Sequence, residues 1–173
     1  MRVLYLDIRC TIILDVLAWV LFHLGIGYLS SRIPHDHFDP NKRFYKSFSW
    51  EKGGKIYEKF FRVRTWKKLI PDGSALYPNT FSIRRLPTYK VEYLRRWLVE
   101  SCRAEFCHWM MMIPGAFFFL WNGVSTNVLM IMYAILNNIV PIVAQRYNRP
   151  RMRRMLEHYN AMSPQMELVP IQR

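Results

Sequence analysis

Residues 106–145 read FCHWMMMIPGAFFFLWNGVSTNVLMIMYAILNNIVPIVAQ, a run of forty residues without a Lys, Arg, Asp or Glu. As one α-helix this run would measure about 60 Å, twice the roughly 30 Å thickness of the hydrocarbon core of a bilayer. The sequence WNGVST at residues 121–126 is typical of a turn and lies near the middle of the run. The run therefore predicts a membrane hairpin of two crossing helices, with Pro114 kinking the first of them.

A second apolar stretch lies near the N-terminus. Residues 10–31 contain a single charged residue, Asp15, and are long enough to span a bilayer. A cleaved signal peptide would have a shorter apolar run and a small-residue cleavage site, so we expect a retained membrane segment over residues 8–30. This segment either crosses the membrane or lies re-entrant or along its surface. Asp15 and His23 are costly in lipid, and we expect them to face other helices, or Asp15 to lie at headgroup level.

Positive charge is concentrated outside these apolar stretches. The chain has 173 residues and a formal net charge of +13, although 51% of its residues are hydrophobic. Residues 32–104 hold 17 Lys and Arg against 7 Asp and Glu, and six further Arg follow residue 145. The positive-inside rule places both basic segments in the cytoplasm and the hairpin turn outside. Beside apolar runs of membrane length, we interpret this charge as attraction to anionic lipid and expect no nucleic-acid partner.

Together these patterns predict an all-α membrane protein of the cell membrane, with two or three transmembrane helices in a single multi-pass domain. The first membrane segment (8–30) is followed by a basic, aromatic-rich cytoplasmic or interfacial segment (32–104), the membrane hairpin (105–145) and a basic cytoplasmic tail (146–173). Within the basic segment we expect a helix that begins near Val91.

One pair of residues at the entry to the hairpin has the spacing of a catalytic pair. Glu105 and His108 are three residues apart and share a helix face. A carboxylate can orient an imidazole and stabilise its protonated form, which would make His108 a general base. The same spacing also occurs in metal sites of helical bundles, but such sites need a second Glu-x-x-His motif, and the chain has none. Alternatively, both residues anchor a helix end at the membrane interface. We expect no metal and no cofactor.

Polar residues follow on the second arm of the hairpin and at its exit. Asn138 lies within the apolar run, where a buried amide needs a partner: it either bridges to the first arm or lines a substrate cavity. Arg146 and Arg149 lie just beyond the run, and Arg103 lies just before it. Guanidinium groups suit phosphate or carboxylate, and they also contact lipid headgroups.

Short motifs spread over residues 28–152 carry a family resemblance. The most specific is QRYNRPR at residues 145–151, and the others are RIP (32–34), YKSF (45–48), EK (51–52), GK (54–55), VR (63–64), WK (66–67), DG (72–73), RAE (103–105), HW (108–109) and Asn138. With these motifs the chain resembles the glycosyl-4,4'-diaponeurosporenoate acyltransferases of the staphyloxanthin pathway, the CrtO-type family of small membrane proteins.

The resemblance implies a membrane O-acyltransferase of carotenoid biosynthesis. A fatty acyl chain would pass from a donor such as acyl-CoA to a hydroxyl, taken as C6, of a sugar already esterified to a C30 carotenoid acid. A related glycolipid is an alternative acceptor. The rival hypothesis is a non-enzymatic membrane scaffold for pigment- or lipid-modifying enzymes.

For this reaction we expect His108 to be the base and Glu105 to orient it. The remaining candidates bind substrate. Three arginines would hold the phosphate of the donor or stabilise the oxyanion, and three other residues would contact the sugar: Arg103, Arg146 and Arg149, and Asp72, Trp66 and Asn148.

Overall fold

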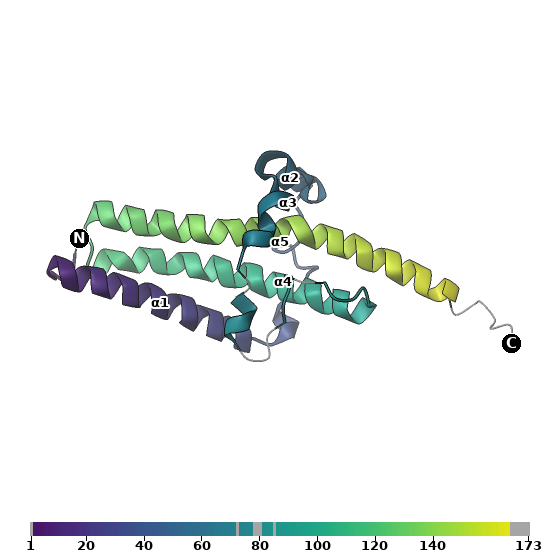
Figure 1. The fold of residues 1–173 in the computed structure, drawn as a ribbon, viewed down its shortest axis with the longest axis horizontal. Helices are drawn as coiled ribbons and strands as arrows, with labels where there is room; N and C mark the ends of the chain where they lie inside the picture. The colour runs from purple at the N-terminus through teal and green to yellow at the C-terminus, as the bar shows by residue number, and fades with distance from the viewer. Residues whose placement is uncertain (1, 72, 78–80, 85, 167–173) are drawn as a thin grey trace. The chain divides into compact units, whose positions relative to one another are not determined.

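We describe the protein from a computed structural model, which covers residues 2–71, 73–77, 81–84 and 86–166 (Figure 1). These described residues contain helices and loops but no β-strand, which confirms the all-α prediction. The helices are α1 (Ile8–Arg32), η1 (His35–His37), η2 (Ser49–Gly54), α2 (Lys55–Phe61), α3 (Val63–Trp66), η3 (Lys67–Leu69), η4 (Gly73–Leu76), α4 (Val91–Met112), η5 (Ile113–Leu120) and α5 (Val124–Met166), where η marks a 3₁₀-helix.

The chain forms two compact units. Met1–Pro34 and Arg103–Ile142 make up the first, which we call the apolar unit. His35–Cys102 and Val143–Arg173 make up the second, which we call the basic unit. Each unit thus combines two separate parts of the chain, and each is described by itself.

Helix α1 of the apolar unit has the length and surface of a membrane helix. Its N-cap residue is Asp7, whose carboxylate accepts from the backbone N–H groups of Arg9 and Cys10. Within its most apolar part 11% of the residues are buried, so the remaining apolar side chains face outward. A helix from the core of a soluble protein would bury most of them. With α5, whose apolar part lies in Val124–Ala161, the described residues include two helices long and apolar enough to cross a bilayer. These helices indicate association with a membrane.

The predicted hairpin is present in the apolar unit. Helix α4 ends at Met112 and continues as the 3₁₀-helix η5, in which Pro114 occupies the first turn. Residues 121–123 connect η5 to α5, as the turn sequence predicts. At Gly115 the two arms approach so closely that an added Cβ would lie 3.2 Å from Ala134 Cβ. Helix α5 does not end with the apolar run at Gln145, because it continues as one helix to Met166.

Polar contacts fix the direction of α1 against the hairpin. The N–H groups of Val3 and Leu4 donate to the carbonyl oxygen of Leu120, so the start of the chain lies at the turn of the hairpin. At the other end of α1, Arg103 of α4 donates to the carbonyl oxygens of Ser31 and Ile33. Helix α1 therefore runs antiparallel to the first arm and parallel to the second (Figure 1).

Asp15 of α1 is buried, and its environment explains how a carboxylate is accommodated in an apolar helix. Its Oδ1 atom accepts from Trp121 Nε1 and from Asn122 Nδ2, both at 2.7 Å. These donors belong to the connection between the two arms, so Asp15 ties α1 to the turn. Asp15 therefore faces the connection between the two arms, where the expectation was contact with another helix.

We predict that Asp15→Ala lowers the free energy of unfolding by about 1–3 kcal/mol, because it leaves two buried donors unsatisfied. Asp15→Asn keeps an acceptor oxygen and should lose less. Thermal unfolding in detergent micelles measures both, and Val16→Ala, at an exposed position on the same helix, is the control. An Asp15→Ala protein as stable as the wild type would contradict the prediction.

A glycine at the end of η2 allows the basic unit to pack tightly. Gly54 has a φ of +86°, a conformation that favours glycine. A Cβ at this position would lie 2.9 Å from the carbonyl oxygen of Tyr147 on α5. Next to this contact, Tyr57, Val63, Ala144 and Tyr147 form a buried cluster. Because Gly54 has no side chain, η2 and α2 can pack directly against the backbone of α5.

We predict that Gly54→Ala destabilises the basic unit by about 1–3 kcal/mol, through backbone strain and the close contact with Tyr147. Gly25→Ala is the matched control, because Gly25 has open space around it and lies within a helix, where alanine is favoured. Unfolding of purified protein in denaturant measures both. Equal stability of the two variants would show that the close approach at Gly54 has no energetic effect.

Candidate functional site

His108 makes a specific contact within the apolar unit. Its Nδ1 atom lies 2.9 Å from Oδ1 of Asn138, which projects from the facing arm, α5. Asn138 is buried and also donates from Nδ2 to the carbonyl oxygen of Ala134, at 2.8 Å. The predicted amide bridge between the two arms is therefore formed, and its partner on the first arm is the candidate base.

This bridge determines which nitrogen of His108 carries the proton. Because Asn138 Nδ2 donates to the carbonyl oxygen of Ala134, it is the amide oxygen that faces the imidazole. This oxygen can only accept a hydrogen bond from the ring. Nδ1 of His108 is then the donor, and Nε2 of the neutral ring carries the lone pair. A base needs this arrangement, with one nitrogen held by an orienting group and the other able to take a proton.

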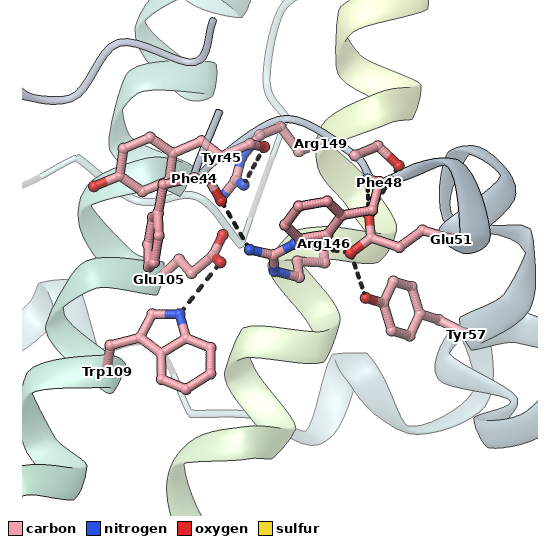
Figure 2. Close-up of polar contacts among 10 residues, drawn as sticks. Phe44, Tyr45, Phe48, Glu51, Tyr57, Glu105, Trp109, Arg146 and Arg149 are labelled. Carbon is pink, nitrogen blue, oxygen red and sulfur yellow. Dashed lines mark hydrogen bonds and ion pairs between the residues drawn. The ribbon is translucent and has the colours of Figure 1, made fainter. Parts of the chain in front are cut away.

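Glu105, one turn before His108, is fully buried. Its Oε1 atom accepts from Trp109 Nε1 at 3.3 Å, as Figure 2 shows. Arg103, two residues earlier, is held against the last carbonyl groups of α1. A guanidinium at this position satisfies carbonyls that have no partner within the helix and complements the negative end of the helix dipole. The contacts of Arg103 thus give it a structural role at the end of α1.

Glu51 is the centre of a polar network in the basic unit. The carboxylate is fully buried and accepts four hydrogen bonds. Tyr57 Oη and Arg146 Nη1 donate to Oε1, both at 2.8 Å, while Ser47 Oγ and the Phe48 N–H donate to Oε2. A buried carboxylate is stable when its lone pairs are filled in this way and a cation lies beside it. The network joins η2 and α2 to α5 (Figure 2).

The two arginines of the exit motif, Arg146 and Arg149, each donate several hydrogen bonds within the protein. Arg146 pairs with Glu51 and donates from Nη2 to the carbonyl oxygen of Phe44. Arg149 is 3% exposed and donates to the carbonyl oxygens of Tyr45 and Ser101 and to Ser101 Oγ. Arg149 therefore clamps the loop before η2 to α4. Figure 2 shows its contact with Tyr45.

A pocket of about 210 Å³ opens beside these arginines in the basic unit. Its walls come from the loop before η2, from η2 itself and from α5. The charged side chains of the lining are four cations and one carboxylate, namely Lys46, Arg146, Arg149, Arg153 and Glu51. The electrostatic character of this pocket suits an anion.

Two of the candidate sugar contacts, Asn148 and Trp66, lie in the same unit. Asn148 Oδ1 accepts from Lys67 Nζ at 2.7 Å, and Trp66 donates from Nε1 to the carbonyl oxygen of Phe61. Burial, together with the nearby Arg151 guanidinium, lowers the pKa of Lys67. Asp72, the remaining candidate, lies outside the described residues.

Two of the candidate arginines, Arg146 and Arg149, line the pocket, but the sequence did not indicate the other charged residues of its lining. Glu51, Lys46 and Arg153 were not among the candidates. Glu51 and Arg146 are 95 positions apart, and no local pattern links them. One signal was present, since YKSF at 45–48 and EK at 51–52 belong to the motifs of the resemblance. Within the described part of the chain, no three His, Cys, Asp or Glu side chains gather as metal ligands would.

Comparison with known proteins identifies the class and then the family. The all-helical fold with two apolar spans and a basic pocket is that of a small membrane-associated protein. The sequence model of glycosyl-4,4'-diaponeurosporenoate acyltransferase matches residues 41–158. Proteins of that name from Staphylococcus aureus strains MRSA252 and N315 are 37% and 38% identical to the chain over 138 and 140 residues. Each alignment covers 80% of this chain and 83% of the relative. No solved structure matches.

The chain therefore belongs to the glycosyl-4,4'-diaponeurosporenoate acyltransferase family. Membership confirms the resemblance and classes the protein as an acyltransferase.

We predict that Arg149→Lys lowers the free energy of unfolding by about 2 kcal/mol, because an ammonium cannot reproduce the three-way contact with Tyr45 and Ser101. The control is Arg95→Lys, at an exposed position on α4, which should change stability by less than about 0.5 kcal/mol. Chemical unfolding of the purified proteins compares them. If both variants match the wild type, the contacts of Arg149 do not stabilise the fold.

Proposed function

We propose that the protein esterifies a fatty acyl chain onto a sugar hydroxyl of a glycosylated carotenoid, or of a related glycolipid, at the cytoplasmic face of the membrane. Family membership supports the reaction class and the acceptor class. The observation that carries the proposal is the Asn138–His108 contact, which holds an imidazole in the tautomer that a general base needs.

In the proposed mechanism, His108 Nε2 takes the proton of the sugar hydroxyl as its oxygen attacks the acyl carbonyl carbon of the donor. The carbonyl π electrons move to its oxygen and form a tetrahedral oxyanion. When the oxyanion collapses, the bond to the leaving group breaks, and the leaving group takes the proton from the imidazolium. The products are the ester and, from an acyl-CoA donor, the free thiol. His108 returns to its neutral form.

Two neighbours would support His108 in this cycle. Asn138 Oδ1 would hold Nδ1–H throughout and keep the ring in position. Glu105, buried one turn earlier on α4, would stabilise the imidazolium by its charge. For the sugar contacts we retain Trp66, Asn148 and Asp72 as candidates. For the donor we assign the basic pocket beside Arg146.

The direction of α1 supports the proposed topology. The start of the chain and residues 121–123 lie at one end of the apolar unit, and Arg103 lies with the end of α1 at the other. The positive-inside rule assigns the end with Arg103 to the cytoplasm. If all three segments cross, the chain begins outside, and residues 32–104 and the segment after residue 145 are cytoplasmic.

We predict that His108→Ala reduces acyl transfer by at least about 10²-fold, because the reaction loses its base. The assay uses purified protein, acyl-CoA and glycosylated carotenoid, with the ester detected by mass spectrometry. His37→Ala, which removes an exposed imidazole, is the matched control. Asn138→Leu should also lose activity, because the ring is no longer held.

Thermal unfolding shows whether each variant is folded, so loss of activity and loss of structure are separated. A folded His108→Ala protein with full activity would remove His108 from the mechanism. Activity that appears only when other enzymes of pigment synthesis are added would favour the scaffold hypothesis instead.

A further inference from the structure

One cation that lines the pocket of the basic unit, Lys46, forms no ion pair in the described part of the chain. Arg146 is paired with Glu51, and the donors of Arg149 are taken up by Tyr45 and Ser101. Lys46, by contrast, is exposed, and its ammonium has no hydrogen bond or ion pair with any residue in the described part of the chain. Its position in the lining therefore leaves three donors available to a ligand.

A second cation of the pocket is held in place by its neighbours. Arg153 donates from Nη1 to Asn41 Oδ1 and from Nη2 to the carbonyl oxygen of Pro40. These acceptors are neutral, so they orient the guanidinium without cancelling its charge. Arg146 is held by its ion pair with Glu51 and by the Phe48 ring, with 5.2 Å between the guanidinium carbon and the ring centroid. Two arginines are thus preorganised around Lys46.

The charge and volume of the pocket limit what it can hold. Four cations and one carboxylate leave a formal charge of +3 among the lining side chains. A volume of about 210 Å³ is below the roughly 300–1,000 Å³ of pockets that enclose drug-sized ligands. The pocket can therefore enclose a compact anionic group, but not a fatty acyl chain or a whole nucleotide-linked donor.

We propose that Lys46, Arg146 and Arg153 bind a phosphoryl group, the phosphate ester of the acyl donor. This inference rests on the proposed function, which requires an activated acyl donor. Arg149 then acts as a positioning residue that holds the loop carrying Lys46. The same phosphate chemistry occurs in a nucleotide donor, in a phospholipid headgroup and in free phosphate, and the choice of probes distinguishes these sources.

The test measures binding to the full-length protein in neutral detergent micelles by isothermal titration calorimetry. The probes are 3′,5′-ADP for a nucleotide donor, glycerol 1-phosphate for a lipid headgroup, and inorganic phosphate. We expect at least one phosphate ester to bind more tightly than inorganic phosphate, with an affinity that falls as salt rises. Preference for 3′,5′-ADP assigns a nucleotide donor, and preference for glycerol 1-phosphate assigns a lipid.

Variants of Lys46 give the decisive comparison. Lys46→Gln removes a charge without breaking a contact of the fold, and it should weaken binding of the preferred probe at least tenfold. Lys46→Arg should retain most of the affinity. Arg95→Gln, which removes an exposed cation from α4, is the control and should change binding less than twofold. The proposal is overturned if no ester binds more tightly than inorganic phosphate, or if Lys46→Gln binds the preferred ester as the wild type does.

Failure of the proposed phosphate site can be distinguished from failure of the proposed function. His108→Ala should bind the probe normally but fail to transfer acyl groups, whereas Lys46→Gln should raise the KM for the donor more than it lowers kcat. Acyl transfer by a protein whose pocket binds no phosphate ester would leave the proposed reaction standing and remove this pocket from it. If the wild type binds the phosphate ester normally but transfers no acyl group, the phosphate site stands and the proposed reaction is removed.

Discussion

The structure depends on one constraint: a polar group on an apolar helix must find its partner within the protein. Asp15 satisfies this constraint through Trp121 and Asn122, and so fixes α1 to the turn of the hairpin. His108 satisfies it through Asn138 and so joins the two arms. Because hydrogen bonds to these partners orient both groups, each is held in one geometry. The first contact fixes a helix in the fold, and the second orients the imidazole of His108.

The basic unit buries a charged group, the carboxylate of Glu51, and supplies its partners. Glu51 is fully buried yet stable, because two side-chain hydroxyls, a backbone N–H and Arg146 fill its lone pairs. The close approach of Gly54 to Tyr147 brings η2 near enough for this network to form. The network engages Arg146, and Arg149 is engaged by Tyr45 and Ser101. Arg146 and Arg149 therefore help to build the pocket, and Lys46 adds a cation that is exposed.

The sequence allowed the helical fold, the hairpin and its turn to be predicted, because each rests on a local pattern. An uncharged run twice the bilayer thickness must fold back, and Pro114 must alter the helix near it. The start of α4 at Val91 was predicted as well, from a local N-terminal signal. The continuation of α5 beyond Gln145 was not, because the change to charged residues there resembled a helix end. Two distant pairs were also beyond sequence reasoning: Trp121 lies 106 positions from Asp15, and Arg146 lies 95 positions from Glu51.

The central claim is that this chain alone performs acyl transfer, with a base held between two apolar helices. The most direct measurement incorporates the purified protein into lipid nanodiscs with acyl-CoA and glycosylated carotenoid, and follows the ester by mass spectrometry across pH. The account predicts ester formation without any other protein, with a rate that falls at low pH as the imidazole of His108 becomes protonated. Absence of product with every acyl donor class tested, from a protein shown to be folded, would contradict it.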